Sequence, residues 1–97
     1  MSKDEALRIV FSALERLNDE LDDPIEVGPH TRLFGADAVI DSLSLVSVIV
    51  DVETDASEAL GLSISLTDDE AISQPVSPFT DPDTLASYIA SLAAKNA

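Results

Sequence analysis

The chain contains no cysteine and no tryptophan, and aromatic residues make up only 4% of it. Without cysteine there is no disulfide, no thiolate metal site and no cysteine nucleophile. Because aromatic rings are scarce, Leu, Val, Ile and Ala must fill the interior. Because the chain has no cysteine, any sulfur chemistry would need a thiol supplied by a cofactor.

Positive charge is also scarce, with 5 Lys and Arg against 19 Asp and Glu and a formal net charge of −14. Such a surface repels the phosphates of nucleic acids and anionic membranes, and it attracts basic patches on other proteins. We therefore exclude nucleic-acid binding and expect protein partners with basic surfaces.

Long apolar runs are missing as well. The longest uncharged apolar stretch lies between Asp41 and Asp51, well short of the ~20 residues that a membrane span requires. Residues 1–5 carry acids where a secretory signal has a basic end. With 97 residues, 45% of them hydrophobic, we expect one domain over residues 1–97, monomeric, cytoplasmic and without membrane contacts.

Two long helices are expected in the first 60 residues. Ser2 and Glu5 form a capping box before a helix, and Pro24 disfavours helix just before it. The apolar face of this helix holds Leu7, Val10, Phe11, Leu14, Leu17 and Leu21. A second helix should run over residues 42–60, capped by Asp41 or Ser42 and stopped by Gly61. Its β-branched residues also suit a strand, but length and capping favour helix.

The connections between these helices carry apolar residues too. Residues 22–40 form a long loop that we expect to be pinned by Ile25, Val27, Leu33, Phe34, Val39 and Ile40. An extended piece with alternating Leu62, Ile64 and Leu66 follows Gly61, and Thr67 with Glu70 predicts a short helix.

A last helix should begin at Pro82 and bury Leu85, Tyr88, Ile89 and Leu92. The predicted fold is all-α: a small antiparallel four-helix bundle of three main helices and one short helix, with a long first loop.

The second helix has two apolar sides. At ~100° per residue, one side gathers the predicted core residues Leu45, Val48, Ile49, Val52, Ala56 and Ala59. Leu43, Val46 and Val50 gather on another side. A bundle this small buries only one side of each helix well. The second stripe therefore lies either under the long loop or open as a docking patch.

Ser42 stands where this helix begins. Serine is a favoured helix cap, and most such serines have no other role. The first-turn amides and the helix dipole also favour an anionic group such as a phosphate ester. Both interpretations of Ser42, as a cap and as an attachment point, follow from its position.

With these features, the chain resembles a carrier protein of the acyl carrier, or phosphopantetheine-binding, family. The resemblance covers nearly the whole chain. It includes the first amphipathic helix, the loop residues 31–35 (TRLFG), the motif of residues 40–43 (IDSL) at a helix start, a short third helix and a closing helix with Tyr88 and Ile89.

The resemblance implies that Ser42 receives 4′-phosphopantetheine from coenzyme A through a separate phosphopantetheinyl transferase. Asp41 matches the acid that assists this transfer by helping to hold the metal and the cofactor. Leu43, Val46, Val50 and Glu53 match the helix face that partners recognise. The arm would carry acyl or related intermediates as thioesters to acyl-loading and acyl-processing enzymes with basic patches. Such a protein is not itself an enzyme and has no metal site of its own.

Departures from the family pattern point to a specialised, freestanding carrier. Ser47 and Thr54 stand where many fatty-acid carriers have acids, and residues 74–79 look like an insertion. These differences favour a dedicated lipid or secondary-metabolite pathway over ordinary fatty acid biosynthesis. The cargo, which could be fatty acyl, polyketide, hydroxyacyl or aminoacyl, stays open.

The sequence also allows three other interpretations. Asp51, Glu53 and Asp55 mimic the start of a calcium loop, but the required Gly and closing Glu are missing. His30, the only histidine, is separated from Ser42 by a long loop, and no G-x-S-x-G turn surrounds the serine, which argues against a hydrolase. The remaining alternative is an unmodified acidic helical protein-interaction module.

Overall fold

The computed structural model describes residues 1–35, 37–61, 63–66 and 77–95, with Ser42 described by its backbone. Within these ranges the protein is all-helical and has no strand. Its helices are α1 (Lys3–Asn18), α2 (Ser42–Leu60) and α4 (Pro82–Lys95). The predictions of three main helices are confirmed. The short helix predicted from Thr67 and Glu70 lies outside the described residues.

Local chemistry defines the ends of the helices as the sequence predicts. The Ser2 hydroxyl accepts a hydrogen bond from the Glu5 amide at 3.2 Å, so the predicted cap of α1 is present. Gly61 ends α2 in the left-handed conformation with φ 69°, which suits a residue without a Cβ. Pro82 is the first residue of α4, where its missing N–H costs nothing.

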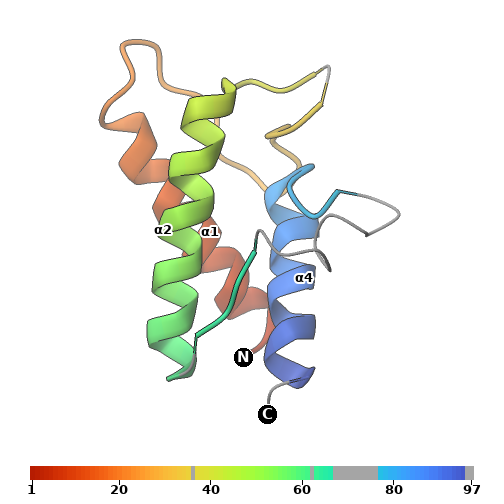
Figure 1. The fold of residues 1–97 in the computed structure, drawn as a ribbon. Helices are drawn as coiled ribbons and strands as arrows, with labels where there is room; N and C mark the ends of the chain where they lie inside the picture. Colours follow the sequence, from red (N-terminus) through yellow and green to blue (C-terminus); the bar gives the residue numbers. More distant parts are fainter. Residues whose placement is uncertain (36, 62, 67–76, 96–97) are drawn as a thin grey trace.

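α1 packs against both α2 and α4 and runs opposite to them, so that the start of α1 and the end of α4 lie at the same end of the molecule (Figure 1). The radius of gyration is 12.5 Å, as expected for a compact domain of this length. The helices contribute these buried residues to one core: Ala6, Val10, Ala13, Leu14, Leu17, Leu45, Val48, Ile49, Val52, Ala56, Leu85, Ala86, Tyr88, Ile89 and Leu92. Ala59, which the helical pattern places in the core, is exposed because it lies in the last turn of α2.

The loop between α1 and α2 is attached to the helices at several points. Leu33 is buried in the core, and Ile25, Val27 and Ile40 pack against it. The Leu33 amide donates to the Thr80 carbonyl at 2.9 Å, and the Asp83 amide donates to the Pro29 carbonyl at 2.9 Å. The prediction that Phe34 and Val39 also pin the loop is wrong, because each of these side chains is 52% exposed.

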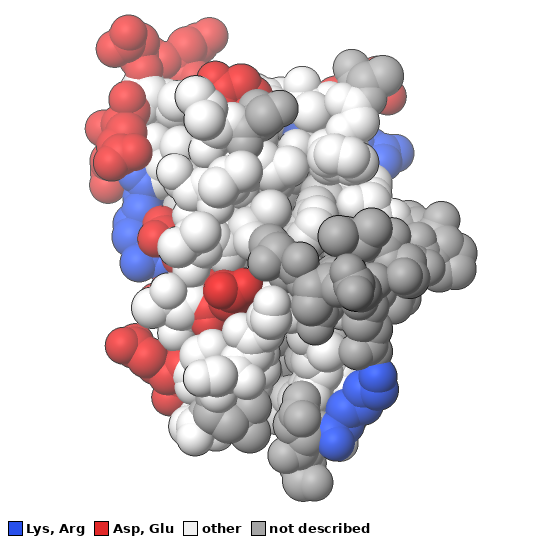
Figure 2. Space-filling model, in the orientation of Figure 1, with Lys and Arg blue, Asp and Glu red and all other residues white. Residues whose placement is uncertain are grey.

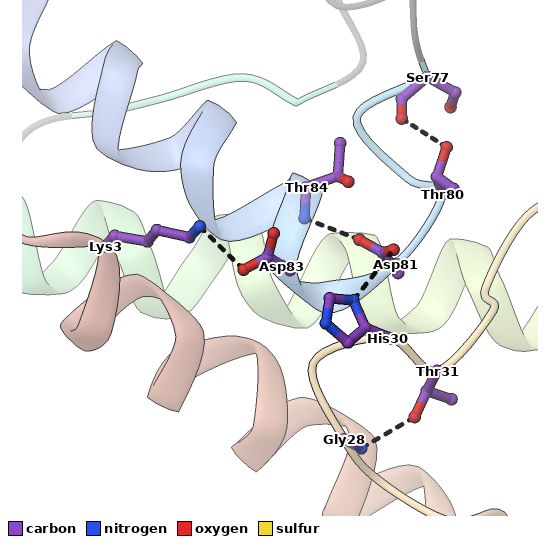
Figure 3. Close-up of polar contacts among 9 residues, drawn as sticks. All are labelled: Lys3, Gly28, His30, Thr31, Ser77, Thr80, Asp81, Asp83 and Thr84. Atoms are coloured by element: carbon purple, nitrogen blue, oxygen red, sulfur yellow. Dashed lines mark hydrogen bonds and ion pairs between the residues drawn. The ribbon is translucent and has the colours of Figure 1, made fainter.

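Side chains at the start of α4 continue this attachment (Figure 3). Asp81 caps the helix by accepting a hydrogen bond from the Thr84 amide at 2.8 Å, and its carboxylate lies 3.9 Å from His30 in the loop. Lys3 of α1 forms an ion pair with Asp83 at 2.8 Å, and this lowers the pKa of the Asp83 carboxyl. The beginning of α4 is thus bonded both to the loop and to the N-terminus of α1.

After α2 the described residues 63–66 run between α2 and α4 (Figure 1). Ile64 and Leu66 are buried and the two serines beside them are exposed, which confirms the predicted alternation for this part of the segment. Leu62, the first residue of the predicted pattern, lies outside the described residues.

Candidate functional site

Asp41 caps the start of α2. Its Oδ1 accepts a hydrogen bond from the Ser44 amide at 2.8 Å, so Asp41 rather than Ser42 is the capping residue. The hydrogen bond from the backbone of Ser44 lowers the pKa of the Asp41 carboxyl, with a further contribution from the Ser44 side chain. The carboxylate is therefore ionised at neutral pH. It also occupies the Ser44 amide, one of the first-turn amides expected to favour a phosphate group.

Ser42 is the first residue of α2. At ~100° per residue, its position lies at the boundary between the exposed side of the helix, which includes Val46, and the core side, which includes Ile49. Because Asp41 acts as the cap, a capping role does not account for Ser42.

The second apolar stripe of α2 is exposed. Leu43 is 82% exposed, Val46 57% and Val50 54%, so the alternative in which the loop covers this stripe is wrong. Figure 2 shows the surface over α2 as largely neutral, with acidic side chains gathered along one edge. Three large apolar side chains on successive turns of one helix form the contiguous kind of patch that marks interaction sites. The docking role itself stays a prediction.

Two loop residues are also apolar and exposed. Phe34 and Val39, at 52% each, complete the set of large hydrophobic residues that the described part of the chain exposes. From the sequence, both residues were expected to pin the loop onto the bundle. No sequence signal separates them from Leu33, which is equally apolar and is buried.

Glu53, the fourth predicted docking residue, differs from the others. It is half-buried, and its Oε2 accepts a hydrogen bond from the Leu66 amide at 2.8 Å. Together with the Ser57 hydroxyl, which accepts from the Ile64 amide at 3.1 Å, it attaches residues 63–66 to α2. Glu53 therefore has a structural bond that the sequence did not indicate, and its recognition by a partner stays a prediction.

The geometry does not support the calcium-binding or the hydrolase interpretation. Asp51, Glu53 and Asp55 all lie inside α2, and Asp55 forms an ion pair with Arg16 of α1, which raises the pKa of Arg16 through the hydrogen bond between them. No group of three or more His, Asp or Glu in the described ranges is placed to hold a metal ion. His30 is an exposed loop residue beside the cap of α4, and its lack of a catalytic role stays a prediction.

The described helices also include none that is long and apolar enough to cross a membrane. Comparison of the chain with protein-family models, with curated proteins and with solved structures found no match.

Proposed function

We propose that the protein is a carrier that bears acyl or related intermediates as thioesters on a 4′-phosphopantetheine arm attached to Ser42. The observation that carries the proposal is that α2 begins at Ser42 and exposes Leu43, Val46 and Val50 directly after it. An attachment point and an apolar docking surface are thus adjacent on one rigid helix. The absence of cysteine is consistent with a thiol that belongs to a cofactor.

In the proposed loading reaction, the Ser42 oxygen attacks the β-phosphorus of coenzyme A. The phosphoanhydride bond breaks, 3′,5′-adenosine bisphosphate leaves, and the serine proton passes to a base of the transferase. Asp41 supports this step because it is exposed, adjacent in sequence and ionised, and so is suited to a divalent cation brought in with coenzyme A. When bound, the arm supplies the thiol that forms the thioester.

The partners we propose are a phosphopantetheinyl transferase and acyl-loading and acyl-processing enzymes with basic patches. Leu43, Val46 and Val50 would fill an apolar recess of the partner, while a net charge of −14 attracts its Lys and Arg residues. Contacts between exposed charges are screened by salt, so docking should be transient and salt-sensitive.

The same proposal includes a fourth helix, the oligomeric state, the cellular location and the kind of pathway. A short helix between residue 66 and residue 77 would complete a four-helix bundle with α1, α2 and α4. We further propose that the carrier is monomeric and cytoplasmic, is not itself an enzyme, and serves a dedicated lipid or secondary-metabolite pathway.

The alternative is an acidic protein-interaction module that uses the same exposed stripe and carries no arm. It is favoured by the same observation of an apolar patch on α2. The two proposals differ only in the use of the Ser42 hydroxyl.

Intact-mass spectrometry distinguishes them after incubation with coenzyme A, Mg²⁺ and a broad-specificity phosphopantetheinyl transferase. The carrier predicts that the wild type gains the mass of one phosphopantetheine group and that Ser42→Ala does not. Ser47→Ala is the matched control, because Ser47 is an exposed serine on the same helix, and it should be modified like the wild type. An unchanged wild-type mass would favour the unmodified module.

A further inference from the structure

An apolar hollow of about 410 Å³ opens between the first turn of α2 and the loop that precedes it. The loop comes to this turn from the start of α4 (Figure 1). The inner wall of the hollow is formed by the core residues Leu33 and Leu45, which are 1% and 8% exposed. Phe34 and Ile40 line it closer to the surface, since Phe34 is 52% exposed and Ile40 is half-buried. The hollow therefore presents an apolar surface to solvent.

Hydrogen bonds and burial hold both walls of the hollow in place. On the loop side, Leu33 belongs to the core, and the Ala38 amide donates to the Gly35 carbonyl at 3.2 Å. On the helix side, the Leu45 amide donates to the Asp41 carbonyl at 3.0 Å. The hollow is therefore preformed, and an occupant does not have to order the loop on binding.

The hollow is open on its solvent side, and this favours a side chain of another protein over a free small molecule. Small-molecule sites bury about 70–90% or more of the surface of their ligand. A free molecule in this hollow would stay exposed on its outer side, and the ring of Phe34 would stay exposed with it. A protein partner covers both, because the contacts around a buried anchor side chain exclude water.

The charge at the rim determines which side chain fits the hollow. Except for Asp41, the residues that line it are apolar or glycine. The Asp41 side chain is exposed, and its hydrogen bonds with Ser44 lower the pKa of its carboxyl, so it is negatively charged at neutral pH. The formal net charge of −14 acts in the same direction. An acidic anchor is therefore repelled, whereas an apolar anchor with a Lys or Arg beside it fits both the hollow and its rim.

We propose that this hollow is a docking site for an apolar side chain of a partner protein, and that a Lys or Arg next to this anchor pairs with Asp41. Asp41 and Leu45 lie on either side of Ser42 in sequence, so the anchor brings the surface of the partner to the start of α2. A second copy of the chain is a poor occupant, because it carries the same net charge. The site goes beyond the function proposed above, since it requires no group on Ser42 and serves a carrier and an unmodified module alike.

Selection from a random peptide library displayed on phage tests which occupant the hollow prefers. Peptides are selected on the unmodified wild type at low salt, and those that also bind Ala38→Trp are removed, because the new ring fills the hollow. The remaining peptides should share an apolar residue with a Lys or Arg close to it. If no peptide remains, or if the remaining peptides lack such a pair, the proposal is overturned.

Amide NMR spectra of the ¹⁵N-labelled protein locate the binding of a selected peptide. The peptide should shift the amides of Leu33, Phe34, Ala38 and Ile40. Phe34→Ala removes one wall without filling the hollow and should weaken binding several-fold, while Ala59→Trp, on the exposed last turn of α2, is the matched control for Ala38→Trp and should bind like the wild type. Circular dichroism checks that the variants are folded. Shifts confined to the far end of α2, or unchanged binding by folded Phe34→Ala, would contradict the site.

Asp41→Asn separates the charge at the rim from the charge of the whole protein. It keeps a capping side chain at the start of α2 and should weaken the same peptide about two- to fivefold at low salt, the range of exposed ion pairs. The difference should disappear at high salt. Asp37→Asn is the matched control, because Asp37 is an exposed acid of the same loop and does not line the hollow. Equal effects of the two substitutions would argue against pairing with Asp41.

Other occupants of the hollow give different results. If toluene alone shifts the same amides with an affinity equal to that of the peptide, the hollow is a small-molecule site and the docking site is ruled out. If those amides shift with protein concentration in the absence of peptide, a second copy occupies the hollow, and the proposal fails as well. None of these measurements depends on loading of Ser42, so failure of the docking site is distinguishable from failure of the carrier function.

Discussion

Replacing Leu33 by Ala measures how firmly the loop between α1 and α2 is held against the bundle. Leu33 is 1% exposed and belongs to the common core. If the loop is an ordered part of the fold, removing this side chain should destabilise the whole domain. If the loop is only a tether between helices, the substitution should have little effect.

The expected loss follows from the burial of the side chain. Leu→Ala removes three carbons, and at about 0.8 kcal/mol per buried carbon the transfer contribution alone is ~2.4 kcal/mol. A cavity contribution raises such losses to about 2–5 kcal/mol in well-packed cores. Leu33 also lines an open surface hollow between the first turn of α2 and the loop before it, so water can enter the space that the side chain leaves. We therefore expect about 2–3 kcal/mol, near the lower end of that range.

Urea denaturation followed by circular dichroism gives the free energy of unfolding of the variant and the wild type. Phe34→Ala is the matched control, since Phe34 is the next residue and is 52% exposed; its loss should stay below about 1 kcal/mol. A loop held firmly against the bundle is ruled out if Leu33→Ala costs less than about 1 kcal/mol, or if the two variants cost the same.

Three further predictions concern the ends and the exposed side of α2. Gly61→Ala should cost about 1 kcal/mol, because φ is 69° at Gly61, while Gly28→Ala, at ordinary φ and with its nearest contact at 3.8 Å, should be nearly neutral in the same urea assay. Asp41→Asn should be less stable than the wild type above the ordinary pKa of a carboxyl. Because the folded-state pKa of Asp41 is lowered, this difference should vanish as pH falls through the lowered pKa of the folded protein. Asn is also a good helix cap, so a constant difference down to acid pH would contradict a stabilising contribution from the ionised carboxylate. Leu43→Ala, at an 82% exposed position, should raise the KM of a transferase for the carrier without changing stability, and a KM equal to that of Ser47→Ala would argue against docking there.

Much of the helical framework was predictable because its signals are local. The cap at Ser2, the stop at Gly61 and the start at Pro82 each depend on the chemistry of one or two residues, and each lies where the sequence places it. The exposed stripe of α2 follows from helical periodicity, since a helix in a small bundle has one buried side. Periodicity alone did not show whether a loop would cover that stripe.

The less predictable features depend on contacts between distant segments. Phe34 and Val39 are apolar like their buried neighbours, and loops have no period that separates inward from outward residues. The bond between Glu53 and the Leu66 amide joins residues in different segments, and nothing in either local sequence indicates it.

The most direct test of the carrier account is the mass of the protein purified from its own host, followed by fragmentation that locates any added group. A carrier should bear a phosphopantetheine arm, free or acylated, on the peptide that contains Ser42 and on no other peptide. A protein that comes from its host entirely unmodified, or modified at another residue, would contradict it.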